Sequence, residues 1–274
     1  MPEGDSIFRA ARTLNQALAG KVVVRFESML PLLNRVHEDH PLTGRTIDSV
    51  KSVGKHLLMQ FSGGLTLRTH MRMSGSWHIY RPGEPWQRPR RDMRIVLATS
   101  DFEAVGFNIP VAELIRDSRV ASEMSRAVGP DLLDEAFDAS EALHRLRAQA
   151  TSEIGDALLN QRAMAGVGNV YKSETLFSAR INPFIRVEQL TDDQLADIIE
   201  TARKLLRVNV TAASAPLTTY IGLRRTTGRD GPDERLWVYG RARRPCRRCG
   251  TAIQVRKQGR DARLTYWCET CQPS

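Results

Sequence analysis

The chain has 274 residues, enough for two domains that each bury a core. It is 41% hydrophobic and 26% charged, and no apolar run approaches the roughly 18 residues that span a bilayer, so an integral membrane protein is excluded. The net charge of +9, from 40 basic and 31 acidic side chains, favours a polyanionic partner. Because the first twelve residues, MPEGDSIFRAAR, lack the apolar stretch of a secretion signal, we expect a cytoplasmic protein with no membrane contact.

The first half of the chain predicts one helix and then a series of strands. Apolar residues recur at helical spacing from Ile7 to Leu18, and Gly20 ends the pattern. Short strand-like runs follow, separated by Gly, Pro and polar residues: Lys21 to Phe26, Thr46 to Val53, His56 to Phe61, Leu65 to Met71, Ser76 to Tyr80 and Met93 to Thr99. Spacing of this kind predicts a β-sandwich, so the N-terminal domain (residues 1–115) should be a sandwich with an N-terminal helix.

From about residue 111 the pattern becomes helical. Helices are predicted at Val111 to Arg116, Ser140 to Ala148, Ser152 to Leu159, Asn169 to Phe177, and from a capping box at Thr191 onward. We therefore expect an α+β protein whose second domain, residues 125–235, is helical. The segment from Ala212 to Pro232 is rich in small and polar residues and predicts a loop.

The last 34 residues hold most of the excess charge and all four cysteines. From Arg241 onward nine basic residues face two acidic ones, although a charge run can also be an ordinary solvated surface. The spacing Cys246-x2-Cys249, then Cys268-x2-Cys271, is that of a tetrahedral zinc site rather than of two disulfides, because the cytosol keeps thiols reduced. Four thiolates leave no open position for water, so the metal would be structural, in a hairpin spanning residues 240–274.

Pro2 and Glu3 are the candidates for covalent chemistry. A proline at position 2 is in most chains part of a frayed terminus. Removal of the initiator methionine, however, would expose a secondary amine, and an α-amino group titrates near pH 8, so part of it is an uncharged nucleophile at neutral pH. Condensation with a sugar carbon would give a cationic iminium that favours β-elimination, and Glu3 is placed to move protons.

Three further residues are weak signals when taken alone. Lys55 occupies a predicted turn and is by itself most simply a solvated lysine. The run Gly166-Val-Gly168-Asn169 precedes a predicted helix, where backbone N–H groups and Asn169 can hold a phosphate. Arg263 lies five residues before a cysteine and could be one more exposed charge.

In combination, however, these motifs resemble one known family. Pro-Glu-Gly after Met1, the VGKHLL run at Lys55, the GVGNVY run at Asn169, Val238-Tyr-Gly-Arg241 and the four-cysteine hairpin occur in this order along the whole chain. The pattern resembles the formamidopyrimidine-DNA glycosylase and endonuclease VIII family.

The resemblance implies a sandwich domain, a helical domain with a helix-two-turn-helix motif, a zinc finger, and DNA bound in the cleft between the domains. By similarity, Pro2 attacks C1′ of a damaged nucleotide and Glu3 assists the proton transfers. Lys55, Asn169 and Arg263 match the family's phosphate contacts, so Lys55 and Arg263 join the catalytic set, while His70, Met73 and Tyr239 complete the DNA-binding set. The damaged nucleotide leaves the stack, and β- and δ-elimination follow. The implied cofactor is one structural zinc ion, and the implied partner of a monomeric protein is DNA with oxidised bases or abasic sites.

Two departures from the family pattern affect the expected substrate. The family's usual Glu is replaced by Ser6, beside Asp5. The Arg-Arg-Phe-Gly run that supplies two space-filling residues in the oxidised-purine branch is absent from Asp101 to Pro110, although Met73 matches the third filler. With its Met-Pro-Glu-Gly start, the chain therefore resembles the endonuclease VIII branch, which favours oxidised pyrimidines. The segment from Ala212 to Pro232, however, is about as long as the loop that covers 8-oxoguanine in the purine branch, so the choice of substrate stays open.

Two alternatives stay open at this point. A zinc-hairpin DNA-binding protein on the same scaffold, without catalysis, would explain Ser6 and the missing fillers. An enzyme restricted to abasic sites or single-stranded DNA would explain the missing fillers alone.

Overall fold

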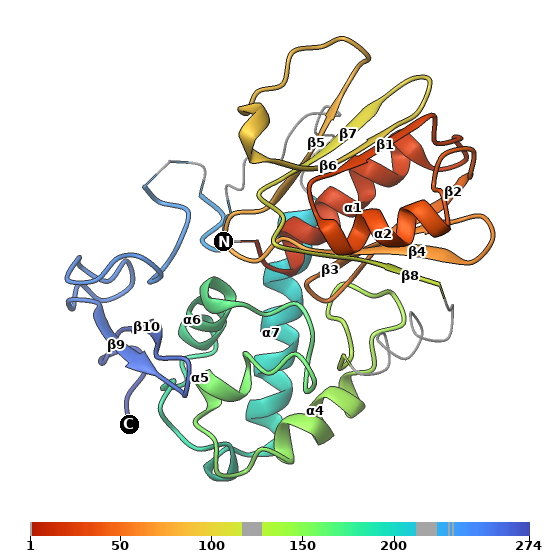
Figure 1. The fold of residues 1–274 in the computed structure, drawn as a ribbon. Helices are drawn as coiled ribbons and strands as arrows, with labels where there is room; N and C mark the ends of the chain where they lie inside the picture. Colours follow the sequence, from red (N-terminus) through yellow and green to blue (C-terminus); the bar gives the residue numbers. More distant parts are fainter. Residues whose placement is uncertain (1, 117–127, 212–223, 230, 232) are drawn as a thin grey trace. The chain divides into compact units, whose positions relative to one another are not determined.

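A computed structural model describes residues 2–116, 128–211, 224–229, 231 and 233–274 (Figure 1). These residues form two compact units, one containing residues 2–116 and the other containing residues 128–211 and those from 224 onward. Most of the loop predicted from Ala212 to Pro232 lies outside the described residues.

The first unit is a β-sandwich with an N-terminal helix, as the sequence predicted. Helix α1 (Gly4–Leu18) precedes it. Both sheets of the sandwich are antiparallel. The first sheet has the strand order β2 (Ile47–Val53), β3 (His56–Phe61), β4 (Leu65–His70), β8 (Val111–Ile115). The second sheet has the strand order β1 (Arg25–Ser28), β6 (Met93–Ala98), β7 (Glu103–Phe107), β5 (Ser76–Tyr80).

Helix α1 and the two sheets share one apolar core. The helix contributes Ile7, Leu14 and Leu18, and the strands contribute Leu67 and Ile95, all at most 1% exposed. In Figure 1 the helix lies along the sandwich strands, and it contacts both sheets through β2 and β5. This shared core holds the beginning of the chain in place.

A second layer covers the outer face of the β5-containing sheet. The segment that joins β5 to β6 includes a short 3-10 helix, η1 (Arg90–Asp92), and Trp86, which packs edge-on against Phe107 at 5.7 Å between ring centroids. The Tyr80 hydroxyl accepts the N–H of Gln87 at 3.1 Å.

Helix α2 (Pro31–Asp39), which the sequence patterns did not indicate, contacts β1 and β8.

One prediction in this unit was wrong. Residues 111–116 were expected to begin the helical region, but Val111–Ile115 is strand β8, in antiparallel register with β4 from His70 to Thr66. A run of six residues is too short for its periodicity to separate strand from helix, and the open edge of β4 decides the outcome. Strand β1 also begins later than predicted, at Arg25, and β7 was not predicted.

The second unit is helical. It contains α4 (Ala139–Arg147), α5 (Ile154–Ala157), α6 (Asn169–Ser178), the 3-10 helix η2 (Val187–Gln189) and α7 (Asp192–Thr211). Thr191 and Gln194 form the predicted capping box, with N–H donations to each other's side chains at 2.9 and 3.2 Å. The long helix α7 packs against both α4 and α6.

The unit ends in a two-stranded hairpin, β9 (Gln254–Gln258) and β10 (Arg263–Trp267), flanked by the four cysteines. We call residues 246–271 the cysteine hairpin. No helix among the described residues is both long and apolar enough to span a membrane.

Candidate functional site

The first turn of α1 fixes Pro2 and Glu3. Pro2 is half-buried, and Glu3, the residue before the helix, is fully buried. The N–H of Glu3 donates to Oγ of Ser6 at 3.0 Å, and the N–H of Ser6 donates back to the carbonyl oxygen of Glu3 at 3.0 Å. Ser6 therefore performs the capping role that a longer Glu or Gln side chain performs at this position of a helix.

Helix α1 directs these residues toward Lys55. Asn15 Oδ1 accepts the N–H of Val50 at 2.8 Å, and the N–H of Gly20 donates to the carbonyl oxygen of Ile47 at 2.8 Å. Because later helix positions bond to earlier strand positions, α1 runs antiparallel to β2. The start of α1 thus lies toward the end of β2 at which the chain turns through Lys55.

Lys55 occupies a two-residue hairpin turn. Val53 pairs with His56, so only Gly54 and Lys55 connect β2 to β3, and Gly54 takes the left-handed φ of 58° that such a turn requires. The side chain of Lys55 is half-buried. A short, tightly paired turn fixes its backbone position.

Two histidines beside this turn, His56 and His70, are neutral at pH 7. Their rings meet edge-on with centroids 4.8 Å apart. Burial, followed by the charges of neighbouring groups, lowers the pKa of His56 to about 4 and lowers the pKa of His70 as well. Nδ1 of His70 accepts the N–H of Arg72 at 3.0 Å, so in the neutral ring the proton lies on Nε2. His70 is thus a neutral hydrogen-bond donor.

Met73 projects from the turn that follows β4. Met73 is 69% exposed, as part of an exposed run from Arg72 to Ser74 that lies between buried Met71 and buried Gly75. The N–H of Gly75 donates to the carbonyl oxygen of Met71 at 2.8 Å, and a Cβ at Gly75 would come within 2.6 Å of that oxygen. The structure therefore brings Lys55, His70 and Met73 to one end of the first sheet.

The region expected to hold the other space-filling residues contains none. Residues 101–110 form β7 and its flanking turns, in which Phe107 is fully buried and Phe102 is half-buried. This agrees with the absence of the family's Arg-Arg-Phe-Gly run.

In the second unit, Asn169 starts α6 after a glycine turn. Gly166 has a φ of 106°, and Gly168 precedes the helix. The side chain of Asn169 is 7% exposed, and its Nδ2 donates to the carbonyl oxygen of Leu264 at 2.8 Å. Oδ1 is buried without a hydrogen-bond partner among the described residues. Asn169 is thus joined to the residue after Arg263.

Arg263 and Tyr239 lie around the same strand of the cysteine hairpin. The Arg263 side chain is 43% exposed, with Asp261 3.7 Å from its guanidinium. Tyr239 packs edge-on against Tyr266, with ring centroids 5.0 Å apart. Asn169, Tyr239 and Arg263 are therefore assembled in one place within this unit.

Two buried charges hold that assembly, and the sequence reasoning assigned no role to either. Glu174 is fully buried and accepts the N–H groups of Trp237, Val238 and Tyr239 at 2.8 to 2.9 Å, as well as the Thr226 hydroxyl. Burial raises its pKa, and these hydrogen bonds oppose the rise. Lys172, also fully buried, donates to Oγ1 of Thr265 at 2.6 Å. The sequence signal that could have identified Lys172 and Glu174 is their position on a predicted helix just after the possible phosphate-binding motif.

The four cysteines form one cluster of free thiols. All four Sγ atoms lie within 4.8 Å of one another. Sulfur atoms around a tetrahedral zinc ion are about 3.8 Å apart, given Zn–S bonds of about 2.3 Å. The donor set and its spacing therefore fit a single closed metal site.

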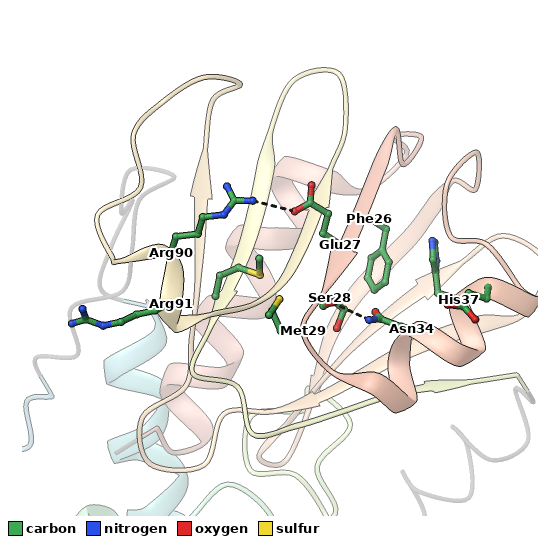
Figure 2. Close-up of a pocket in the computed structure, with 10 residues that line it drawn as sticks. Phe26, Glu27, Ser28, Met29, Asn34, His37, Arg90 and Arg91 are labelled. Atoms are coloured by element: carbon green, nitrogen blue, oxygen red, sulfur yellow. Dashed lines mark hydrogen bonds and ion pairs between the residues drawn. The ribbon is translucent and has the colours of Figure 1, made fainter.

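A hollow of about 680 Å³ on the first unit contains none of the predicted site residues (Figure 2). It lies between β1, α2 and η1, and its wall includes Phe26, Met29, Asn34 and Arg90. Asn34 donates to the carbonyl oxygen of Ser28 at 3.0 Å, while Arg90 is 3.9 Å from Glu27. We therefore place the candidate site in two regions. One contains Pro2, Lys55 and Met73, and the other contains Asn169 and Arg263; the hollow is not part of either.

The protein is thus a β-sandwich that begins with the Pro2-Glu3 pair and a helical unit that ends in a four-cysteine hairpin. The N-terminal domain model of formamidopyrimidine-DNA glycosylase matches residues 1–110, and its H2TH domain model matches residues 128–220. "Probable endonuclease 8 2" of Streptomyces coelicolor is 45% identical over 99% of this chain and 94% of that protein. "DNA-(apurinic or apyrimidinic site) lyase Nei2" of Mycolicibacterium smegmatis is 38% identical over 99% of both chains. The chain belongs to the formamidopyrimidine-DNA glycosylase and endonuclease VIII family.

Solved structures confirm the fold. Lactococcus lactis formamidopyrimidine-DNA glycosylase, in a complex with DNA containing an abasic site, matches with a TM-score of 0.82 at 24% identity and full coverage of both chains. The predicted sandwich, helix-two-turn-helix unit and four-cysteine hairpin are therefore the family's architecture.

Proposed function

We propose that this protein is a bifunctional DNA glycosylase and abasic-site lyase of base excision repair, with a preference for oxidised pyrimidines. The relatives named endonuclease 8 and abasic-site lyase support the general activity. The observation that carries the proposal for this chain is the start of α1, where the Ser6 cap fixes the backbone of the buried Glu3, directly after Pro2.

The proposed chemistry begins when Met1 has been removed. The positive end of the α1 dipole, next to Pro2, favours the uncharged amine. The Pro2 nitrogen attacks C1′, the glycosidic bond breaks, and the base leaves with a proton that Glu3 helps to deliver. The Pro2 nitrogen then loses its proton and the C1′–O4′ bond breaks, with a proton taken up by O4′, which opens the sugar ring and leaves a cationic iminium between C1′ and the nitrogen. The iminium acidifies the C2′ proton, whose loss expels the 3′ phosphate; a second elimination expels the 5′ phosphate.

DNA would be held by residues from each unit. Lys55 and Arg263 supply positive charge, His70 supplies a neutral N–H donor, and Asn169 and Tyr239 supply polar contacts. The cysteine hairpin would bind one structural zinc ion through Cys246, Cys249, Cys268 and Cys271. We expect a monomer that acts in the cytoplasm on DNA.

Capture of the iminium by borohydride tests the chemistry. With Met1 removal verified by mass spectrometry, the protein should form a covalent adduct with abasic DNA. Pro2→Gly should weaken this adduct. Glu3→Gln should impair excision of a base more than cleavage at a preformed abasic site, because only the first step requires a proton for the leaving base.

A panel of lesions tests the substrate preference. Thymine glycol and dihydrouracil should be excised faster than 8-oxoguanine. The absence of any adduct from the processed protein would show that the scaffold is a DNA-binding protein without catalysis. Cleavage confined to abasic or single-stranded DNA would show the more restricted enzyme, which the lack of exposed fillers between residues 101 and 110 favours.

A further inference from the structure

The hollow on the first unit, between β1, α2 and η1, contains apolar side chains that the proposed function does not use (Figure 2). Phe26, Met29 and Met93 all line it. Met29 is 64% exposed, and Phe26 is half-buried. Methionine and aromatic side chains are enriched where proteins bind one another, and methionine adapts to apolar partners of different shape. The hollow, of about 680 Å³, therefore offers an apolar contact surface that the described residues leave open.

Positive charge lies on the η1 side of the hollow. Arg90 extends toward Glu27 (Figure 2), but the ion pair is long at 3.9 Å, and Glu27 is also paired with Arg25. The Arg90 side chain is 77% exposed, and its guanidinium donates no hydrogen bond to any residue that the structure describes. Arg91, the next residue, is exposed as well. Arg90 is therefore only loosely paired, and an anion on a ligand could replace its long contact with Glu27.

The α2 side of the hollow differs in its chemistry. Nδ1 of His37 accepts the N–H of Leu42 at 3.2 Å, so in the neutral ring the proton lies on Nε2. Nδ2 of Asn34 donates to the carbonyl oxygen of Ser28 at 3.0 Å, which leaves the amide oxygen of Asn34 as an acceptor. Glu38 also lines this side and would repel an acidic group. A ligand would thus place its anion at η1 and its neutral polar groups at α2.

We propose that the hollow binds a short acidic segment of a partner protein that has an apolar side chain next to its acidic residue. The carboxylate would pair with Arg90, whose planar guanidinium suits two parallel hydrogen bonds. The apolar side chain would contact Phe26, Met29 and Met93, and the peptide backbone would meet His37 and Asn34.

The exposure of the lining side chains favours a peptide over a small molecule. Small-ligand sites enclose most of their ligand, whereas Met29 and Arg90 are each more than half exposed. The proposal does not depend on the proposed catalysis, because no lining residue belongs to either region of the candidate site.

Selection from a random peptide phage library tests the proposal on the full-length protein. Phage are bound to the wild-type protein and depleted on the double variant Arg90→Glu, Met29→Asp. The retained peptides should be enriched in an acidic residue beside a large apolar one. Enrichment of no sequence, or of peptides without acidic residues, would overturn the proposal.

Fluorescence anisotropy with the most enriched peptide then locates the site. Arg90→Glu and Met29→Asp should each weaken its binding by about tenfold or more, the size of a strong interface contact. Arg90→Lys keeps the charge without the planar fork and should weaken binding less. Arg35→Ala removes an exposed arginine of α2 that does not line the hollow, so it should bind the peptide as the wild type does. Unchanged affinity in both Arg90→Glu and Met29→Asp would overturn the proposal.

Two further measurements separate this site from the DNA-binding regions. A single-stranded oligonucleotide should not displace the peptide; displacement that Arg90→Glu abolishes would show that the hollow contacts nucleic acid instead. Because both substituted side chains are exposed, Arg90→Glu and Met29→Asp should unfold at the wild-type temperature and form the same borohydride adduct with abasic DNA. Peptide binding without any adduct would contradict the proposed catalysis and leave this site intact.

Discussion

The two regions that contain the proposed DNA-binding side chains are held by different forces. Lys55 and Met73 lie in turns, and His70 lies at a strand end, of a sandwich whose core residues are apolar and buried. Arg263 lies on the cysteine hairpin, and Asn169 and Tyr239 contact it. Polar groups hold this region together: Lys172 and Glu174 of α6 bond Thr265 and the N–H groups of residues 237–239, and four thiols cluster at the hairpin. An apolar core tolerates the loss of a polar contact, whereas a polar interior depends on each partner. The comparison predicts that each region is most sensitive to a different kind of substitution.

Loss of the metal site should have the largest effect, and only in the second region. Chelation or Cys268→Ser should unfold the cysteine hairpin, since a structural zinc ion contributes on the order of 10 kcal/mol to small domains. We expect DNA affinity to fall at least a hundredfold. Hydrogen exchange should show lost protection in residues 246–271 and unchanged protection in β2, β3 and β4. Glu269→Gln, a neighbouring exposed change, is the control; equal loss of protection in both regions would contradict the comparison.

A cavity in the apolar core should be the most damaging single change to the first region. Leu67 is fully buried at the centre of β4, and Leu67→Ala should lower the free energy of unfolding by about 3 to 4 kcal/mol. Urea unfolding measures this loss, and Leu32→Ala, at a side chain that is 76% exposed, should change it little. A small loss at Leu67 would mean that this core is loosely packed.

The matching change in the second region removes a charge without removing volume. Glu174→Gln places an amide N–H₂ among N–H donors and should lower the free energy of unfolding by about 2 to 3 kcal/mol. The resonances of Trp237 and Tyr239 should shift with it. Glu135→Gln, on the exposed surface of the same unit, should be neutral, and an equally small effect at Glu174 would show that its hydrogen bonds are not needed.

The two regions should contribute alike to the salt dependence of binding. Each phosphate neutralised adds about −0.9 to the slope of log affinity against log salt on duplex DNA. Lys55→Ala and Arg263→Ala should therefore each flatten the slope by about 0.9. His70→Gln should weaken binding and leave the slope unchanged, because the His70 ring is neutral at pH 7. An unaltered slope for Lys55→Ala or Arg263→Ala would exclude a phosphate contact by that residue.

Acid should weaken the first unit slightly before the second. In the unfolded chain a histidine binds a proton near its ordinary pKa of about 6.5, whereas burial lowers the pKa of His56 and His78 in the fold to about 4. The contribution of these neutral histidines to the free energy of unfolding is therefore complete above pH 6.5 and is lost as the pH falls toward 4. We expect the first unit to lose about 1 to 2 kcal/mol between pH 7 and 5. NMR titration of the imidazole protons checks the cause, and titration near pH 6.5 would refute it.

The sequence predicted the elements with a clear period and the residues with distinctive chemistry. Helix α1, most strands, the Thr191 cap and the four cysteines belong to this group. The prediction of a helix was wrong at Val111–Ile115, where tertiary pairing with β4 decides the structure. The sequence also assigned no role to Lys172 and Glu174, because their partners are backbone groups and two threonines about 50 to 90 residues away in sequence, which leave no local pattern.

The exposure of Met73 makes the protein vulnerable to peroxide. A thioether that is 69% exposed oxidises readily to the sulfoxide, which is polar and a poor wedge between stacked bases. The oxidants that damage DNA bases would then also impair the side chain that we expect to fill the space left by a displaced nucleotide. If Met73 has this role, a methionine sulfoxide reductase would be needed to restore it after such stress.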